Sequence, residues 1–102
     1  GSALFDRWLN RADDQWLLLH APIVKAGTLT LQLVAFDEAG AYLESVDVVA
    51  AFGRGWHGIP LSQVAWPEGA AQFKVKLWLG GTPDAEAVVE RVLLLKAAPL
   101  QP

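Results

Sequence analysis

Two stretches of this chain alternate between apolar and other side chains with a period of two residues. In residues 29–35 every odd position is apolar, with Thr30 and Gln32 between them. In residues 73–79 the odd positions are again apolar and alternate with Lys74, Lys76 and Trp78. Successive side chains of a β-strand point to opposite faces of its sheet. The two stretches therefore predict strands that each place one face in a hydrophobic core.

Turn-forming residues divide the rest of the chain into short segments. Residues 37–40 (DEAG) predict a turn with Gly40 at positive φ, and residues 41–52 predict the returning strand of a hairpin. Residues 53–60 contain three glycines and a proline and predict a loop, and Pro67 with Gly69 predicts a second turn. Residues 80–84 (GGTPD) are expected to end a strand. Residues 85–97 then favour a last strand over a helix because of their valines.

The N-terminal part is less regular. Residues 15–27 predict a strand or a strand pair that ends at Gly27, and residues 4–14 fit a short helix, an edge strand or a short irregular cover. Five or six closely spaced strands indicate an all-β fold, an antiparallel β-sandwich of the jelly-roll type. We expect one domain over residues 3–98, with a C-terminal tail at residues 99–102. Gly1-Ser2 is expected to be a remnant of cloning in front of a domain taken from a longer protein.

Composition excludes several classes of partner. The 102 residues carry a net charge of −3 with scattered basic residues, whereas nucleic-acid binding needs a basic stripe. No apolar run reaches the roughly 18 residues of a membrane span. The chain has no cysteine, so disulfides and cysteine-based metal sites are excluded.

Catalytic patterns are missing too. His20 and His57 have no metal-ligand spacing, and none of the three serines lies in a nucleophile elbow. We therefore predict a protein that is not an enzyme and holds no metal or cofactor.

Short motifs in a recognisable order cover about three-quarters of the chain. They are Gly27-Thr28, the turn at 37–40, a glycine-flanked Trp56, the turn at 67–70, the strand at 73–79 and a closing strand at 88–95. In this order the chain resembles the jelly-roll carbohydrate-binding modules, galactose-binding-like β-sandwiches of bacterial polysaccharide-handling proteins. The resemblance implies non-catalytic binding of a polysaccharide or oligosaccharide outside the cytoplasm: in the periplasm, at the surface or secreted. Where that family often has a ligand- or calcium-holding Asp, this chain has Glu90, so no calcium site is carried over.

The parity of Trp78 gives the candidate site. Leu77 and Leu79 face the core, so Trp78 faces the other way, beside Lys74 and Lys76. Tryptophan and tyrosine bind sugars by stacking on their C–H faces, while polar side chains bond the hydroxyl rim. We predict ligand binding by Trp78, Lys76, Lys74, Gln32, Phe36 and Tyr42. The alternative for Trp78 is packing beneath a loop or the N-terminal segment.

Structural roles are expected for the other tryptophans. Trp56 is expected to plug the end of the core, Trp66 to anchor a turn, Trp16 to lie in the core and Trp8 to act as a cover. His57 is expected to hydrogen-bond backbone.

Two further functions stay open beside carbohydrate binding. One is a structural or protein-interaction sandwich without a sugar site, docked on neighbouring domains of a longer extracytoplasmic chain. The shortage of Asn and Tyr, one of each, favours it. The other is an exposed edge strand that pairs with a peptide or with another copy of the domain.

Overall fold

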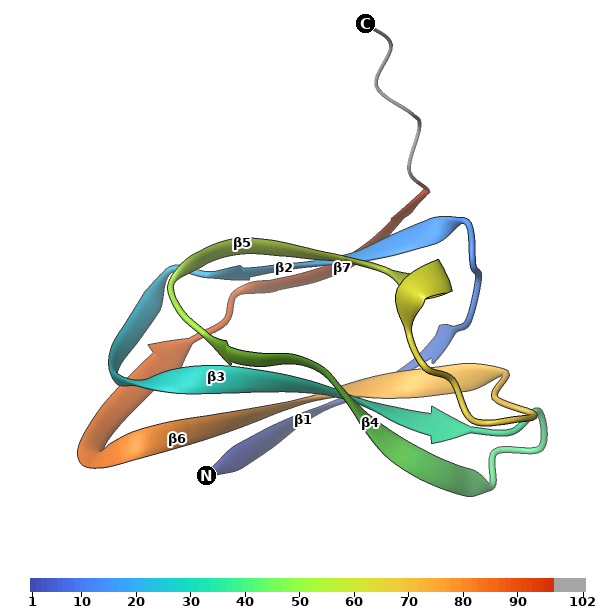
Figure 1. Ribbon diagram of the computed structural model, residues 1–102, viewed down its shortest axis with the longest axis horizontal. Helices are drawn as coiled ribbons and strands as arrows, with labels where there is room; N and C mark the ends of the chain where they lie inside the picture. The colour runs from blue at the N-terminus through green and yellow to red at the C-terminus, as the bar shows by residue number, and fades with distance from the viewer. Residues whose placement is uncertain (97–102) are drawn as a thin grey trace, which may run out of the picture.

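Seven strands form two antiparallel sheets in the computed structural model, which describes residues 1–96 (Figure 1). Sheet A has four strands in the order β1 (Ser2–Asn10), β6 (Gln72–Val88), β3 (Ile23–Phe36) and β4 (Tyr42–Phe52). Sheet B has three strands in the order β5 (Gly55–Pro60), β2 (Gln15–Ala21) and β7 (Arg91–Lys96). A 3-10 turn, η1 (Leu61–Gln63), follows β5. The predicted all-β antiparallel sandwich is confirmed.

The chain passes repeatedly from one sheet to the other. Within residues 1–96, β3 and β4 are the only consecutive strands that share a sheet; each other connection crosses between the layers (Figure 1). Most strands that pair within a sheet are therefore far apart in the sequence. The longest is the β3–β6 ladder, which runs from Ile23 opposite Val88 to Phe36 opposite Gln72.

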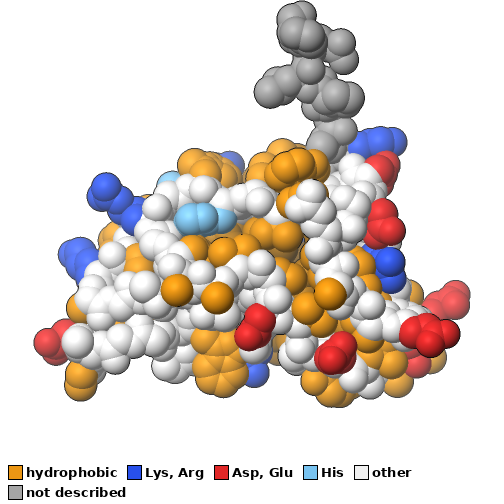
Figure 2. Space-filling view, in the orientation of Figure 1, with side chains coloured by type: hydrophobic (Ala, Val, Ile, Leu, Met, Phe, Trp, Pro, Cys, Tyr) orange, Lys and Arg blue, Asp and Glu red, His pale blue; other side chains and the backbone are white. Residues whose placement is uncertain are grey.

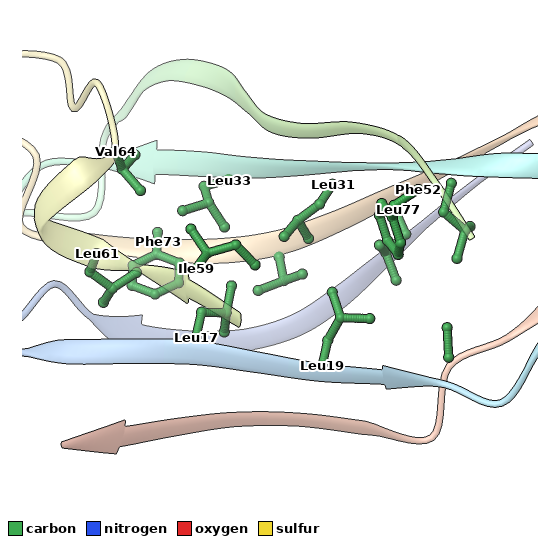
Figure 3. Packing of buried hydrophobic residues seen from close by; sticks show 13 residues of the cluster. Leu17, Leu19, Leu31, Leu33, Phe52, Ile59, Leu61, Val64, Phe73 and Leu77 are labelled. Carbon is green, nitrogen blue, oxygen red and sulfur yellow. The ribbon is translucent and has the colours of Figure 1, made fainter. Parts of the chain in front are cut away.

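The core lies between the two sheets and follows the predicted parity. Leu31 and Leu33 of β3 point toward Leu17 and Leu19 of β2 (Figure 3). All four are fully buried, as are Phe73 and Val75 of β6. Each such side chain removed from water contributes roughly 1.5–3 kcal/mol. The period-two alternation of these strands thus sets which face of sheet A is internal.

Both predicted turns are present. In the β3–β4 turn, Gly40 has φ 88° and its N–H donates to the Asp37 carbonyl. The Asp37 carboxylate accepts from the Ala41 N–H at 2.8 Å, which closes the turn. In the second turn the Ala70 N–H donates to the Pro67 carbonyl, with Gly69 at φ 83°. The expected turn anchor beside it is confirmed: Trp66 is half-buried against Phe73, with Nε1 donating to the Leu61 carbonyl.

Three expectations about strand boundaries are wrong. Residues 53–60 do not form a loop throughout, because Gly55–Pro60 pairs along β2 as strand β5. Residues 80–84 do not end a strand, and Gly27 does not end one either, since β6 and β3 continue through them. The glycines there instead allow the backbones of β3 and β6 to approach each other closely. A Cβ on Gly27 would collide with the Gly80 carbonyl, and one on Gly81 would collide with the Ala26 carbonyl.

At the N-terminus the edge-strand alternative holds. Residues 2–10 form β1 on the edge of sheet A, and Ser2 pairs with Trp78. At the other end, residues 85–88 belong to β6 and the closing strand is β7, so the preference for strand over helix is confirmed there. The predicted domain end at residue 98 and the tail at 99–102 lie outside the described residues.

Candidate functional site

The outer face of sheet A carries all six residues predicted to bind a ligand. Along β3 and β6, the residues between the core positions point outward, and the register sets Thr30 opposite Trp78 and Gln32 opposite Lys76. β4 adds its own outward residues, with Asp47 opposite Gln32 and Tyr42 opposite Phe36. We call this surface the sheet A face. Its members are Trp8, Thr30, Gln32, Val34, Phe36, Tyr42, Ser45, Asp47, Lys74, Lys76 and Trp78.

One half of the sheet A face is a hydrogen-bonded row across three adjacent strands. The indole Nε1 of Trp78 donates to Gln32 Oε1 at 2.5 Å, and Gln32 Nε2 donates to Asp47 Oδ1 at 2.6 Å. The Lys76 ammonium lies 4.6 Å from the centre of the Trp78 ring. Trp78 nevertheless remains 41% exposed. The row fixes the plane of the indole while part of its surface stays open to a ligand.

The other half is an aromatic cluster further along β6. Trp8 and Phe36 meet edge to face at 4.5 Å between ring centres, and Phe36 meets Tyr42 at 6.1 Å. The Tyr42 hydroxyl is 3.2 Å from Ser45 Oγ. Lys74 lies over the Trp8 ring at 4.3 Å and binds the Asp6 carboxylate, so its side chain is only 14% exposed. Lys74 and Phe36 thus support the cluster, whereas Trp8 and Tyr42 present it to solvent.

Sequence reasoning missed Trp8, Ser45 and Asp47 on this face. Trp8 was expected to be a cover, but it is 47% exposed and packs on Phe36. A bulge in β1 opposite Lys74, between the pairs Phe5–Val75 and Leu9–Phe73, hides its parity in the sequence. Asp47 had a usable signal, because it is a polar residue between Val46 and Val48 in a predicted strand.

The outer face of sheet B corrects two expectations about tryptophan. Trp16 and Trp56 are not in the core but 39% and 56% exposed. The β2–β5 register places Trp16 opposite Pro60 and His20 opposite Trp56. Trp56 stacks on the His20 ring at 4.6 Å, and Trp16 covers the space left by Gly58. With Leu93 and Leu95 of β7, these tryptophans make an apolar outer face.

Figure 2 shows these two faces from the side. Hydrophobic side chains lie along the upper margin, over sheet B, and along the lower margin, below sheet A (Figure 2). Acidic side chains gather at the end where the β3–β4 turn lies (Figure 2). The two faces differ in chemistry: the sheet A face combines aromatic rings with hydrogen-bonding groups, and the sheet B face is mainly apolar.

The histidines lie apart and have separate partners. His20 Nδ1 donates to Glu90 Oε1 at 2.7 Å, and His57 Nε2 donates to the Gly53 carbonyl at 2.8 Å. The expected backbone hydrogen bond of His57 is therefore confirmed, although the residue lies on a strand. In the described part of the chain, no three His, Asp or Glu side chains are grouped as metal ligands. No helix among residues 1–96 has both the length and the apolar character that crossing a membrane requires.

Comparison with known proteins gives no relative for this chain. No protein-family model matches it, and neither the curated proteins nor the solved structures contain a significant match. The function is therefore inferred from the residues and geometry of the two faces.

Proposed function

We propose that the domain is a non-catalytic carbohydrate-binding module that holds an oligosaccharide or polysaccharide on the sheet A face. The observation that carries the proposal is the row from Trp78 through Gln32 to Asp47, which holds a partly exposed indole beside amide, carboxylate and ammonium groups. A sugar ring offers the complementary surfaces: an apolar C–H face for the indole and hydroxyls for the polar groups. In line with the resemblance to such modules, the proposal includes a location outside the cytoplasm of a bacterium.

The arrangement favours a chain of sugars over a single ring. Trp78 and Lys74, which lies over the Trp8 ring, are four residues apart on β6. A strand rises ~3.3 Å per residue, so the Trp78 indole and the aromatic cluster around Trp8 are ~13 Å apart. Trp78 would stack on one sugar ring. Trp8 and Tyr42 would contact another further along, with Ser45 and Lys76 near the hydroxyl rim.

A binding screen of matched tryptophan variants tests the proposal. Wild type, Trp78→Ala and Trp56→Ala are applied to a glycan array and to insoluble polysaccharides, with folding checked by circular dichroism. All three should fold, since both side chains are partly exposed. Binding by wild type and Trp56→Ala but not by Trp78→Ala supports the proposal. Folded wild type that binds no glycan, or Trp78→Ala that binds as wild type does, contradicts it.

The sheet B face favours a second function, that of a protein-interaction domain without a sugar site. Trp16, Trp56, Leu93 and Leu95 are exposed on one face. Exposed apolar patches of this kind mark interaction surfaces more often than sugar sites. Under this alternative the face would pack on another domain or on a partner protein. In the same screen, the absence of glycan binding by folded wild type favours it.

A further inference from the structure

Sheet B is one strand narrower than sheet A. On the β4 and β5 side, Val64 of the segment after β5 is nearly buried, and a pocket of about 320 Å³ opens between β4 and β5. The other side brings together β1, the edge of sheet A, and β7, the edge of sheet B. Lys96 at the end of β7 pairs with Asp14 in the β1–β2 connection at 3.3 Å.

The core is incomplete on the β1 and β7 side. Phe5 and Leu9 of β1, and Val92 and Leu94 of β7, pack against the core yet remain only partly buried. An apolar pocket of about 330 Å³ opens here between the start of β1 and the passage from β6 to β7. Its lining residues include Phe5, Leu79, Ala87 and Val89. Inward-facing side chains at the centre of the sandwich, such as Leu31 and Val75, are fully buried.

β7 is the edge strand least protected against pairing. β1 and β4 are interrupted by bulges, and β5 has Gly55 at φ 122° and ends in Pro60. Such features discourage edge-to-edge pairing. β7 pairs with β2 in regular register and has four consecutive apolar residues, from Val92 to Leu95. Within residues 1–96 no strand pairs with its outer edge, where backbone N–H and C=O groups are available.

Two arginines lie on the strands that border this opening. Arg7 on β1 and Arg91 at the start of β7 are exposed, and neither takes part in an ion pair within residues 1–96. The neighbouring acids are already engaged: Asp6 with Lys74, Asp14 with Lys96 and Glu90 with His20. A segment that lies along β7 would therefore meet two arginines that have no ion-pair partner within residues 1–96.

We propose that β7 accepts an extended peptide segment of a partner protein as the fourth strand of sheet B. Alternate apolar side chains of the segment complete the core between β7 and β1, one of them in the pocket beside Val89. Acidic residues flanking the segment pair with Arg91 and Arg7. This is β-strand addition, in which backbone hydrogen bonds supply affinity and side-chain pockets supply selectivity. The proposal does not depend on carbohydrate binding, since it uses the opposite sheet.

A fused test strand can be trapped by a disulfide, because the natural chain has no cysteine. The nine-residue probe Glu-Val-Thr-Val-Cys-Val-Thr-Val-Glu is joined to the C-terminus of the full chain by a long Gly/Ser linker. Its valines face the core when its cysteine lies on the outer side, as Leu93 does. The linked probe reaches a roughly millimolar effective concentration. Leu93→Cys on β7 is compared with Ala50→Cys on the β4 edge, both exposed positions.

We expect cross-linking to Leu93→Cys at least about tenfold faster than to Ala50→Cys, because pairing brings the two sulfurs within bonding reach. A control probe has proline in place of the two valines that flank its cysteine. It cannot join the ladder and should lose this advantage. Equal rates at the two edges, or equal rates for the two probes, would overturn the proposal.

Two further measurements separate strand addition from a cysteine effect. In the cysteine-free fusion, with serine in the probe, strand addition should raise Tm by about 5 °C over the fusion that carries the proline probe. Arg91→Glu should slow trapping at Leu93→Cys about threefold, and lysines in place of the probe's glutamates should restore the rate. An unchanged Tm contradicts the added strand, and an unchanged rate in Arg91→Glu contradicts the preference for acidic flanks.

Discussion

Gln32 holds Trp78 in place from the neighbouring strand: its side-chain oxygen accepts the indole N–H at 2.5 Å, while its amide nitrogen donates to Asp47 at 2.6 Å. Because the amide is used at both ends, the indole and the carboxylate are oriented together. An exposed tryptophan without such a partner would sample several rotamers and would have to be ordered when a ligand binds. Gln32 therefore acts as a positioning residue for the proposed sugar site.

Replacing Gln32 by leucine should weaken glycan binding about fivefold and change the free energy of unfolding by less than about 1 kcal/mol, because the hydrogen bonds are exposed to water. The double variant Gln32→Glu with Asp47→Asn rebuilds the row, since the new carboxylate accepts from both the indole and the new amide. It should regain most of the affinity. Isothermal titration with a glycan from the screen, beside urea unfolding, measures both effects. Equal affinity of Gln32→Leu and wild type would refute the positioning role.

The alternation in 29–35 and 73–79 was sufficient to place Trp78 on the outer face. Once Leu77 and Leu79 are assigned to the core, the intervening residue has only the other face. The same parity placed Gln32 and Phe36 on that face. Tyr42 was predicted there because it begins the returning strand of the hairpin. Whether these side chains would contact one another could not be predicted, because that depends on the strand order β6–β3–β4 and on its register.

Trp56→Ala should reduce the free energy of unfolding by less than about 1.5 kcal/mol, although the sequence predicts a loss of at least about 3 kcal/mol for a core tryptophan. The structural reason is that Trp56 is 56% exposed and stacks on the His20 ring on the outer face of sheet B, without entering the core. Trp66→Ala is the matched comparison. Trp66 is half-buried against Phe73 and hydrogen-bonded to Leu61, so we expect about 3 kcal/mol there. Urea denaturation of both variants decides; a larger loss for Trp56→Ala would contradict the assignment.

Trp16 and Trp56 were misplaced for a physical reason. The run from Trp16 to Leu19 is apolar at every position, so it contains no parity that separates an inner from an outer face. Around Trp56, three glycines indicate a loop, yet Gly58 is there because Trp16 and Leu18 of the paired strand occupy the space above it. Glycines that serve close packing and glycines that serve turns look the same in a sequence.

Leu31→Asp should prevent folding, whereas Val34→Asp on the same strand should give a folded protein. Leu31 is fully buried between the sheets, and an unpaired carboxylate there costs more than the whole stability of a domain of this size. Val34 lies on the sheet A face opposite Ser45 and Lys74, where water and an ammonium group are close. Circular dichroism and one-dimensional NMR distinguish the outcomes. A folded Leu31→Asp protein, or an unfolded Val34→Asp protein, would reverse the faces of β3.

Gly27→Ala should lower the free energy of unfolding by about 1–3 kcal/mol, because β3 and β6 approach too closely at this position for a methyl group. The added Cβ would collide with the backbone carbonyl of Gly80, and backbone cannot move aside as a flexible side chain can. Gly53→Ala is the control: a Cβ there meets no atom within 4 Å. Its effect should stay within about 0.5 kcal/mol. Thermal and urea unfolding of the two variants measure the difference. Similar stabilities of the two would mean that the ladder between β3 and β6 relaxes at its bulge to make room for a methyl group.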